Sequence, residues 1–439
     1  MRAKPEEIVS VLREEIQNYD TRVRRDETGT VLEVGDGIAT VYGLDQAVYG
    51  ELVELDTGVK GMVMNLARDS VGVVLLGSEA GVREGTVVRR TGRAADVPVG
   101  DGLIGRVVDV LGQPIDGKGP FSGGTPFCVE KEQYINPMTR PPIRERLEFG
   151  VKAIDGMLTI GKGQRIGIFA GSGVGKSTLM GMIAKHVKAD INVIALVGER
   201  GREVVEFMEK DLGPEGMSRS VLVVATSDQP AMLRKRCPSV ATGIAEYFRD
   251  QGMDVLLMMD SLTRFAMAQR EIGLAVGEPP VARGYTPSIY AELPKLLERS
   301  GNFQKGSITG VYTVLVEGDD TNEPIADTVR GIVDGHIVLS RKLANSNHFP
   351  AIDISASISR LMTDIVPPEH RALASRIRDV MGTYEKNADL VSIGAYKAGT
   401  NPKLDYALSK IDGIQQFLSQ GVDEGFTYEE DLEAMRRLL

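Results

Sequence analysis

The glycine-rich segment 170–178, with the sequence AGSGVGKST, has the most specific chemistry in the chain. It follows the apolar run 165–170 and precedes a helix-like stretch at 178–183, which is the context of a Walker A phosphate loop. Glycines let backbone N–H groups turn toward phosphate oxygens, and the following helix adds the positive end of its dipole. The first motif position is Ala170 rather than glycine, and the alternative is a glycine-rich turn that binds nothing. The motif predicts nucleotide binding by Gly171, Ser172, Gly173, Val174, Gly175, Lys176, Ser177 and Thr178.

Two neighbouring features could complete a magnesium-dependent phosphoryl-transfer site. Lys176 would reach the β- and γ-phosphates of ATP, and the hydroxyl of Ser177 would bind Mg²⁺. The apolar run 255–259 ends in Asp260, so a strand would deliver a carboxylate to the same sheet edge, as in a Walker B motif. The alternative is that Asp260 caps the next helix, a role that Ser261 could also fill.

Another carboxylate follows the apolar run 191–197 in the sequence GERGRE. Glu199 would lie at the same edge of the sheet, where a carboxylate near the γ-phosphate could polarise an attacking water. The alternative is an exposed acid that pairs with Arg200 or Arg202 at the start of a helix. The pattern alone favours this second interpretation.

Short strands that alternate with helices must position these residues. Runs that are apolar on both faces predict a parallel sheet covered by helices, and they lie at 165–170, 191–197, 220–225, 255–259 and 311–316. The chain is therefore expected to have an α/β nucleotide-binding domain. In its sequence, the basic run at 234–236 (RKR) is interpreted as a solvated helix face.

The flanking regions have other patterns. Closely spaced β-branched runs with glycine turns predict a small antiparallel β-barrel, and Asp56-Thr57-Gly58 predicts a hairpin turn within it. Residues 4–19 predict an amphipathic helix, 135–143 an extended proline-rich connector, and the segment beyond 367 a helical domain. The expected divisions are 1–23 (N-terminal helix and lead-in), 24–92 (barrel), 93–366 (P-loop domain) and 367–439 (helical domain).

The composition excludes several classes of protein. The 439 residues are 42% hydrophobic and 26% charged, which is ordinary for globular chains and rules out a disordered or fibrous one. A net charge of −10 argues against a generally basic nucleic-acid binder. Cys128 and Cys237 are too few for a disulfide framework, and the four histidines have no metal-ligand spacing. No apolar run is long enough to span a membrane and MRAKPEEIVS lacks a signal-peptide core, so we expect a cytoplasmic protein.

Longer segments resemble the hexameric rotary ATPases, and from about Phe121 onward the flagellar and type III secretion export ATPases in particular. The segments that carry this resemblance are the phosphate loop, GERGRE at 198–203, the Asp260 strand followed by SLTRFA, PPVARGYTPSIYAELPKLLERSG at 279–301 and EGDDTNEPIADTVRGIVDGHIVLSR at 317–341. Residues 1–120 resemble instead the alpha subunit of F-type ATP synthase, through VLEVGDGIATVYGL, GVKGMVMNLARDSVGVVLLG and VVDVLGQPIDGKGP. The resemblance implies a RecA-like P-loop domain between the barrel and the helices.

The resemblance also implies roles for individual residues. The catalytic members of the family carry Glu in a Gly-Glu-Arg motif and the alpha subunit does not, so Glu199 becomes the expected water-positioning base and Arg200 a further catalytic residue. Glu203 would be an acid near the metal, and Phe349 would stack on adenine, although a core phenylalanine is the alternative. Arg360 resembles the arginine finger that one subunit inserts into its neighbour's site, and the alternative is a surface arginine.

The resemblance implies Mg²⁺-dependent ATP hydrolysis by a homohexamer that energises protein export. Because one chain carries both base and finger, a homo-oligomer could complete every site without a second polypeptide. The implied partners are a stalk protein in the pore, a regulator on the N-terminal segment, export substrates and their chaperones, with peripheral attachment to the cytoplasmic face of the membrane and no nucleic acid. One alternative is a non-catalytic, alpha-like subunit of an F-type ATP synthase. Another is an RNA-translocating hexameric helicase, against which the acidic charge balance argues.

Overall fold

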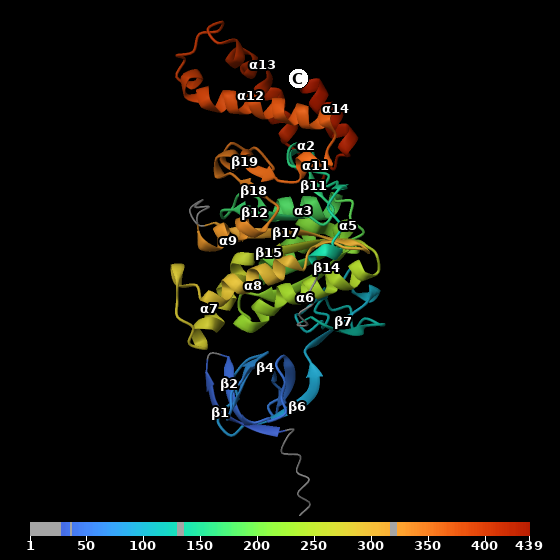
Figure 1. Ribbon diagram of the computed structural model, residues 1–439, viewed down its shortest axis with the longest axis vertical. Coiled ribbons are helices and arrows are strands. Elements are labelled where there is room, and N and C mark those ends of the chain that lie inside the picture. The colour runs from blue at the N-terminus through green and yellow to red at the C-terminus, as the bar shows by residue number, and fades with distance from the viewer. Residues whose placement is uncertain (1–27, 36, 130–135, 317–322) are drawn as a thin grey trace, which may run out of the picture. The chain divides into compact units, whose positions relative to one another are not determined.

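The computed structural model describes residues 28–35, 37–129, 136–316 and 323–439 (Figure 1). The amphipathic helix expected at 4–19 and the lead-in 1–23 lie outside the described residues. The chain divides into two compact units between Ala95 and Asp96. The further division expected at 366/367 stays a prediction.

Six strands of the first unit form a closed antiparallel barrel within the described residues, in the order β1-β2-β5-β4-β3-β6. Their bounds are Thr28–Gly35 (β1), Ile38–Gly43 (β2), Glu51–Leu55 (β3), Lys60–Leu66 (β4), Val71–Leu75 (β5) and Val87–Ala94 (β6). Valines at alternating positions, including Val31, Val41, Val53 and Val73, fill the interior because successive side chains of a strand face opposite sides. The predicted barrel is confirmed. The turn at 56–58 joins β3 to β4 as a hairpin, as predicted, with Gly58 at a left-handed φ of 81°.

The sheet of the second unit has the strand order β19-β18-β12-β17-β15-β13-β14-β8, with β16 beside β17. The neighbours from β18 to β8 are parallel, whereas β19 and β16 are antiparallel to their partners. The bounds are Val107–Val108 (β8), Arg165–Ala170 (β12), Ile191–Glu199 (β13), Ser220–Thr226 (β14), Asp254–Asp260 (β15), Gly301–Asn302 (β16), Ser307–Leu315 (β17), Gly335–Leu339 (β18) and Ile352–Ser359 (β19). The structure confirms the five predicted parallel strands. Two small two-stranded sheets pair Asp96–Val99 (β7) with Thr125–Cys128 (β9), and Arg146–Leu147 (β10) with Ile160–Gly161 (β11).

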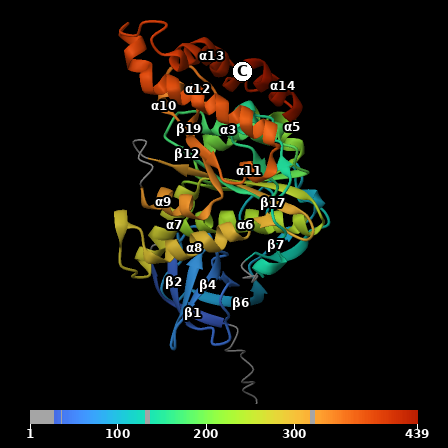
Figure 2. The same cartoon turned by 45° about the horizontal axis from the view of Figure 1, so that its top comes forward.

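Helices cover the sheet, and along the chain they connect one strand to the next (Figures 1 and 2). The residues of β12 and β13 that face one side, such as Ile168 and Ile194, share a core with α3, whereas α6 and α7 pack against other parts of β13 and β17. The bounds are Lys152–Met157 (α2), Lys176–His186 (α3), Gly201–Glu206 (α4), the π-helical turn Phe207–Leu212 (η4), Gly213–Ser218 (α5), Ala231–Asp250 (α6), Leu262–Ala275 (α7), Pro287–Glu298 (α8), Pro324–Ile332 (α9), Arg341–Asn345 (α10) and Met362–Ile365 (α11). Short 3₁₀ turns lie at Asp101–Leu103 (η2), Pro137–Thr139 (η3) and Ala282–Gly284 (η5).

The last three helices in chain order pack on the same core as α3. They are α12 (Pro368–Ser392), α13 (Pro402–Leu418) and α14 (Tyr428–Leu438), which confirms the helical prediction for this region. Ile377 of α12, Phe417 of α13 and Met435 of α14 belong to the core that also contains the sheet residue Ile168. The C-terminal helices and the phosphate-loop strand therefore share one packed interior.

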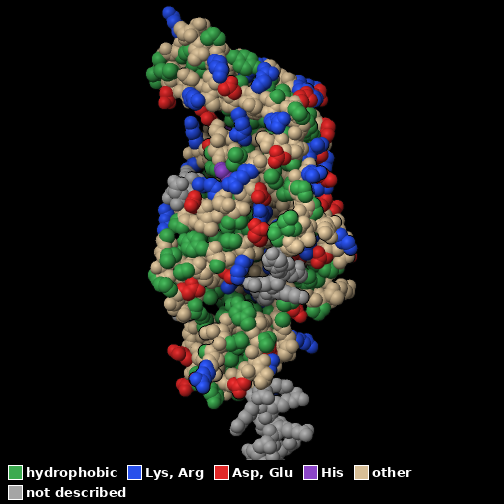
Figure 3. All heavy atoms as spheres, viewed as in Figure 1, with side chains coloured by type: hydrophobic (Ala, Val, Ile, Leu, Met, Phe, Trp, Pro, Cys, Tyr) green, Lys and Arg blue, Asp and Glu red, His purple; other side chains and the backbone are tan. Residues whose placement is uncertain are grey.

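Two expectations need correction. Arg236 was assigned to a solvated helix face, but it is almost fully buried on α6, and its Nε donates to the carbonyl of Val110 at 3.1 Å. The connector 135–143 is not extended throughout, because η3 turns within it. Acidic and basic side chains are intermixed over the face drawn in Figure 3. Among the described helices, none has the length and apolarity needed to cross a bilayer.

Candidate active site

The phosphate loop connects the end of β12 to the start of α3. Gly173 and Gly175 adopt left-handed φ angles of 75° and 89°, which residues with a side chain rarely adopt. Ala170 lies in the strand itself, where it is fully buried and its carbonyl accepts from Val316 N at 3.0 Å. A methyl group at this position therefore leaves the loop unchanged, and the departure from the glycine motif has no structural consequence. The predicted strand–loop–helix arrangement of residues 170–178 is confirmed.

The loop residues differ in what surrounds them. Ser172, Gly173 and Ser177 are exposed, whereas Val174 is buried in the core. Thr178 is half-buried, and its hydroxyl lowers the pKa of the Asp211 carboxyl, although burial raises that pKa overall. The Ser177 hydroxyl lies in the first turn of α3, at the positive end of the helix dipole.

Lys176 brings together the two carboxylates singled out from the sequence. Its ammonium forms an ion pair with Asp260 and lies 3.8 Å from Glu199 Oε1. Asp260 is held in place by Thr313 on β17, whose hydroxyl lies 2.8 Å from Asp260 Oδ1. Ser261, not Asp260, caps α7 by accepting from Arg264 N at 3.3 Å, so the Asp260 carboxylate is left to face Lys176. The carboxyl edges of β12, β13 and β15 therefore converge on one charged centre.

Glu199 has an environment suited to proton transfer. Burial, followed by the negative charge of Asp260, raises the pKa of Glu199 to about 7, and the positive charge of Lys176 opposes this rise. A hydrogen bond with Glu199 lowers the pKa of the Glu203 carboxyl, so the proton of this pair resides on Glu199. A carboxyl that titrates near neutral pH can accept a proton efficiently under physiological conditions.

Arg200 lies away from this centre. Its side chain is 72% exposed, and its Nη1 donates to Glu203 Oε1 at 3.1 Å. The alternative of a surface ion pair therefore describes Glu203 and Arg200, whereas Glu199 faces Lys176. The catalytic role of Arg200 and the metal-binding role of Glu203 stay predictions.

Phe349 lies at the same edge of the sheet as the loop. It follows β18 and α10, and its ring is close enough to Gly175 that a Cβ added there would be 3.4 Å from the ring. The side chain is 40% exposed, which disagrees with the alternative of a core phenylalanine. The exposed ring beside the first turn of α3 offers a flat apolar surface to a bound base.

Arg360 lies at the opposite edge of the sheet from the phosphate loop of its own chain. Ser359 pairs with Gly335 at the beginning of β18, and Arg360 N donates to Asp334 O at 3.0 Å. Since β18 runs parallel to β12, this end of β18 lies beside the start of β12, and the loop follows the end of β12. The Arg360 side chain is exposed, and its Nη2 donates to the carbonyl of Arg330 at 3.4 Å.

The residues fit a magnesium ion that is bound mainly through a nucleotide. No cluster of three or more His, Cys, Asp or Glu side chains capable of holding a metal occurs among the described residues. The Ser177 hydroxyl and the Asp260 carboxylate are hard oxygen donors, and Mg²⁺ commonly takes one or two such protein ligands together with phosphate oxygens and water. This pair can therefore contribute to a Mg²⁺–nucleotide site without a protein cage.

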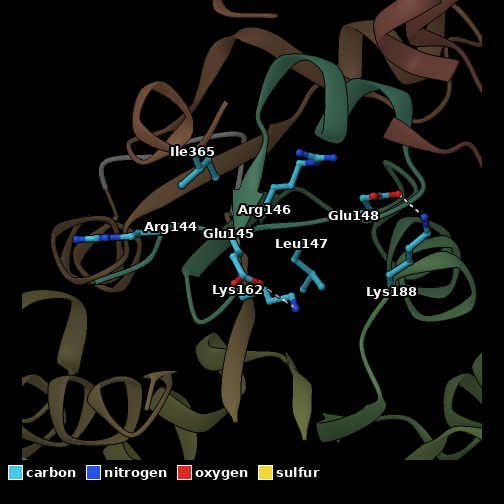
Figure 4. Close-up of a pocket in the computed structure, with 8 residues that line it drawn as sticks. All are labelled: Arg144, Glu145, Arg146, Leu147, Glu148, Lys162, Lys188 and Ile365. Carbon is cyan, nitrogen blue, oxygen red and sulfur yellow. Dashed lines mark ion pairs between the residues drawn. The ribbon is translucent and has the colours of Figure 1, made fainter. Parts of the chain in front are cut away.

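A pocket of about 430 Å³ lies elsewhere, at the amino edge of the sheet (Figure 4). Lys162 precedes β12 and Lys188 precedes β13, whereas the phosphate loop follows β12. These two lysines pair with Glu145 and Glu148 at 3.4 and 2.6 Å. The pocket is therefore distinct from the candidate active site, and its lysines are largely neutralised by its own acids.

The sequence did not single out three residues that the structure places at the site. Thr313 orients Asp260, and Arg341 on α10 donates to the carbonyl of Ser172 at 3.1 Å. The side chain of Arg264 on α7 packs against Gly198, and its charge lowers the pKa of Glu199. Arg264 lies within the SLTRFA segment quoted for the family resemblance, so that resemblance could have identified it. Arg341 is the last residue of the quoted segment 317–341, whereas Thr313 lies in no quoted segment.

Comparisons with known proteins agree with this geometry. Family models match residues 25–92 (ATP synthase alpha/beta family, beta-barrel domain), 150–359 (ATP synthase alpha/beta family, nucleotide-binding domain) and 366–437 (T3SS EscN ATPase C-terminal domain). The chain is 56% identical to the flagellum-specific ATP synthase of Bacillus subtilis, over 94% of this chain and 92% of that one. It also matches the structure of the assembled ATPase EscN from the enteropathogenic E. coli type III secretion system, with a TM-score of 0.89, 44% identity and coverage of 93% and 99% of the two chains. The structure of EscN in complex with its central stalk EscO matches with a TM-score of 0.87, 43% identity and the same coverage.

Proposed function

This chain belongs to the flagellar and type III secretion ATPases of the ATP synthase alpha/beta family, and from that premise we propose how its residues hydrolyse ATP. The phosphate loop binds the triphosphate, Lys176 neutralises the β- and γ-phosphates, and Glu199 accepts a proton from the attacking water. The main support is the convergence of Lys176, Asp260 and Glu199 at one sheet edge, together with the pKa of Glu199 near 7.

The proposed step balances as a hydrolysis. The water oxygen forms a bond to the γ-phosphorus, the bond from that phosphorus to the β–γ bridging oxygen breaks, and ADP leaves. The water proton passes to Glu199, which must be ionised to receive it. When ATP binds, Lys176 exchanges its ion pairs with Asp260 and Glu199 for contacts with the phosphates. Mg²⁺, bound with Ser177 and Asp260, would supply positive charge for the β- and γ-phosphate oxygens.

Substitution of Glu199 tests this assignment. Glu199→Gln keeps the size of the side chain but removes the proton acceptor, so we expect steady-state ATP hydrolysis to fall about 10²–10⁴-fold while ATP binding is retained. Glu209→Gln on the exposed turn after α4 is the matched control and leaves hydrolysis unchanged. A Glu199→Gln variant that hydrolyses ATP at the normal rate would contradict the proposal.

The proposed assembly is a homohexameric ring in which Arg360 acts on the neighbouring subunit's nucleotide. The support is the position of Arg360 at the sheet edge opposite its own phosphate loop, and the solved assembly of the relative EscN. EscN also forms a complex with the central stalk EscO, and a corresponding stalk protein would occupy the pore of this ring. A cytoplasmic location with attachment to the membrane face would follow from a role in export. The regulator, chaperones and export substrates stay predictions.

The non-catalytic alternative is not favoured. Two relatives that match more than nine-tenths of this chain are a flagellum-specific ATP synthase and a type III secretion system ATPase. The barrel matches the beta-barrel domain model of the ATP synthase alpha/beta family, so the N-terminal likeness to the alpha subunit is a likeness to that wider family. Glu199 also faces Lys176, as a catalytic subunit requires.

A further inference from the structure

The segment that follows α13 is bonded through Gln420 to residues 150–152, which are distant in the chain, and to Glu424 nearby. This side chain is 7% exposed, and all of its polar atoms have partners. Its Oε1 accepts from Lys152 N at 2.9 Å, and its Nε2 donates to Gly150 O at 2.8 Å and to Glu424 O at 2.7 Å. Gln420 thus fixes the end of α13 against the N-terminal turn of α2, which belongs to the core of the ATPase unit.

The same segment holds the loop that carries Phe349. The backbone N–H of Gln420 donates to Phe349 O at 2.9 Å, and Ser419 Oγ lies within hydrogen-bond distance of His348 Nδ1, at 3.1 Å. The ring of Phe349 is exposed on one side and approaches Gly175 on the other. Because an exposed ring has little packing to fix it, its position depends on the backbone on which it is mounted. That backbone is tied to the C-terminal helices.

From these contacts we infer that Ser419 and Gln420 are positioning residues for recognition of the nucleotide base. They hold Phe349 at the distance from the phosphate loop at which its ring stacks on adenine. This inference rests on the proposed stacking role of Phe349. The geometry of the base site is then set by the segment just after α13, about 70 positions along the chain from the ring.

The inference distinguishes the base from the phosphates of the ligand. Ser419 and Gln420 together form the anchor of Phe349, and loosening this anchor weakens binding of the base. The triphosphate binds instead to backbone N–H groups of the phosphate loop and to Lys176, which the anchor does not contact. A nonhydrolysable ATP analogue and tripolyphosphate, each with Mg²⁺, are therefore the two probes. Gln420→Ala removes three side-chain hydrogen bonds, so we expect about a threefold to tenfold rise in Kd for the ATP analogue and no change for tripolyphosphate.

The experiment measures both Kd values by calorimetry for the full chain and four variants. Gln416→Ala is the matched control, because Gln416 is an exposed glutamine near the end of α13, just before the segment that holds Gln420, and it leaves both Kd values unchanged. Phe349→Ala removes the ring itself. The double variant Phe349→Ala with Gln420→Ala should bind the ATP analogue no more weakly than Phe349→Ala alone, since the anchor acts only through the ring.

Each outcome decides a separate point. Unchanged ATP-analogue binding by Gln420→Ala, equal weakening for both probes, or additive losses in the double variant would overturn the inference. Unchanged binding by Phe349→Ala would instead refute the stacking role, and the inference with it. If Gln420→Ala does not fold, Ser419→Ala removes the bond to His348 at a less buried position and must weaken analogue binding about twofold or more, again with tripolyphosphate unaffected. A Ser419→Ala variant with unchanged analogue binding would then refute the anchor.

Discussion

Arg360 provides the sharpest test of a shared active site, because the strand register limits its reach. Arg360 N is bonded to Asp334 O, and Arg165 N donates to Asp334 Oδ2, so Arg360 lies at the level of the first residue of β12. The phosphate loop begins beyond Ala170, five residues further along β12, which is roughly 16 Å at the rise of a β-strand. An extended arginine side chain spans about 7 Å from its Cα, so Arg360 cannot reach its own loop.

This geometry predicts complementation between two inactive variants. Arg360→Ala loses the finger, and turnover should fall about 10³-fold or more with ATP binding retained. Lys176→Ala loses the phosphate-binding lysine and is inactive at its own site. In a mixed ring, an interface is intact when an Arg360→Ala subunit supplies the loop and a Lys176→Ala subunit supplies the arginine. At equal mixing this holds for about a quarter of interfaces, because each of the two conditions is met half of the time.

The assay is steady-state ATP hydrolysis by 1:1 mixtures, with differently tagged subunits so that mass measurement confirms exchange. Recovery to as much as about a quarter of wild-type turnover, well above the sum of the two parents, is the expected result. The control mixes each variant with itself after the same exchange treatment, and it shows no recovery. Mixed rings that remain as inactive as their parents would refute the assignment of Arg360 to the neighbouring site.

Three further results follow from the same structure. Turnover should rise about tenfold per pH unit below pH 7 and level off above it, because Glu199, with its pKa raised to about 7, must be ionised to accept a proton. A flat profile of turnover from about pH 5.5 to 8 would contradict the role of Glu199 as base. Asp431→Asn should raise the free energy of unfolding at pH 8 by about 1–3 kcal/mol. Burial and the charge of Asp155 raise the pKa of Asp431 to about 8, so the wild type loses stability as the pH rises from about 4 to 8, and the uncharged asparagine avoids that loss. Urea unfolding at pH 8 and pH 4 measures this, and an equal gain at both pH values would refute it. Thr313→Val should raise the Mg²⁺ concentration for half-maximal hydrolysis about fivefold, because Asp260 loses the hydroxyl that orients it. Thr309→Val on the same strand is the control. An unchanged Mg²⁺ requirement in Thr313→Val would argue against Asp260 as a metal ligand.

The sequence predicted the parts of the fold that local patterns encode. The β-branched runs between glycine turns became the barrel, and the runs apolar on both faces became β12, β13, β14, β15 and β17. The strands β18 and β19 were missed because polar residues such as His336 and Asp353 interrupt their apolar pattern. Arg236 was assigned to a solvated face because its partner, the carbonyl of Val110, lies 126 positions away and leaves no local signal.

The candidate site shows the same limit. Lys176, Asp260 and Glu199 could be identified because each follows an apolar run, and parallel strands end at a common edge. Which acid faces the lysine could not be read from GERGRE, and the structure assigns Glu199 to Lys176 and Glu203 to Arg200. Contacts such as Gln420 with Gly150 join residues 270 positions apart, so they depend on the packing of the C-terminal helices.

In this enzyme, Glu199 at the end of β13 activates the water, and an arginine of the neighbouring subunit completes the nucleotide site. The most direct measurement is a structure of the assembled protein with Mg²⁺, ADP and aluminium fluoride, which mimics the transferring phosphoryl group. In that structure we expect Glu199 to hydrogen-bond the water opposite the leaving oxygen and Arg360 of the adjacent copy to contact the fluoride. A structure in which Glu199 faces away from the nucleotide in every subunit would contradict it.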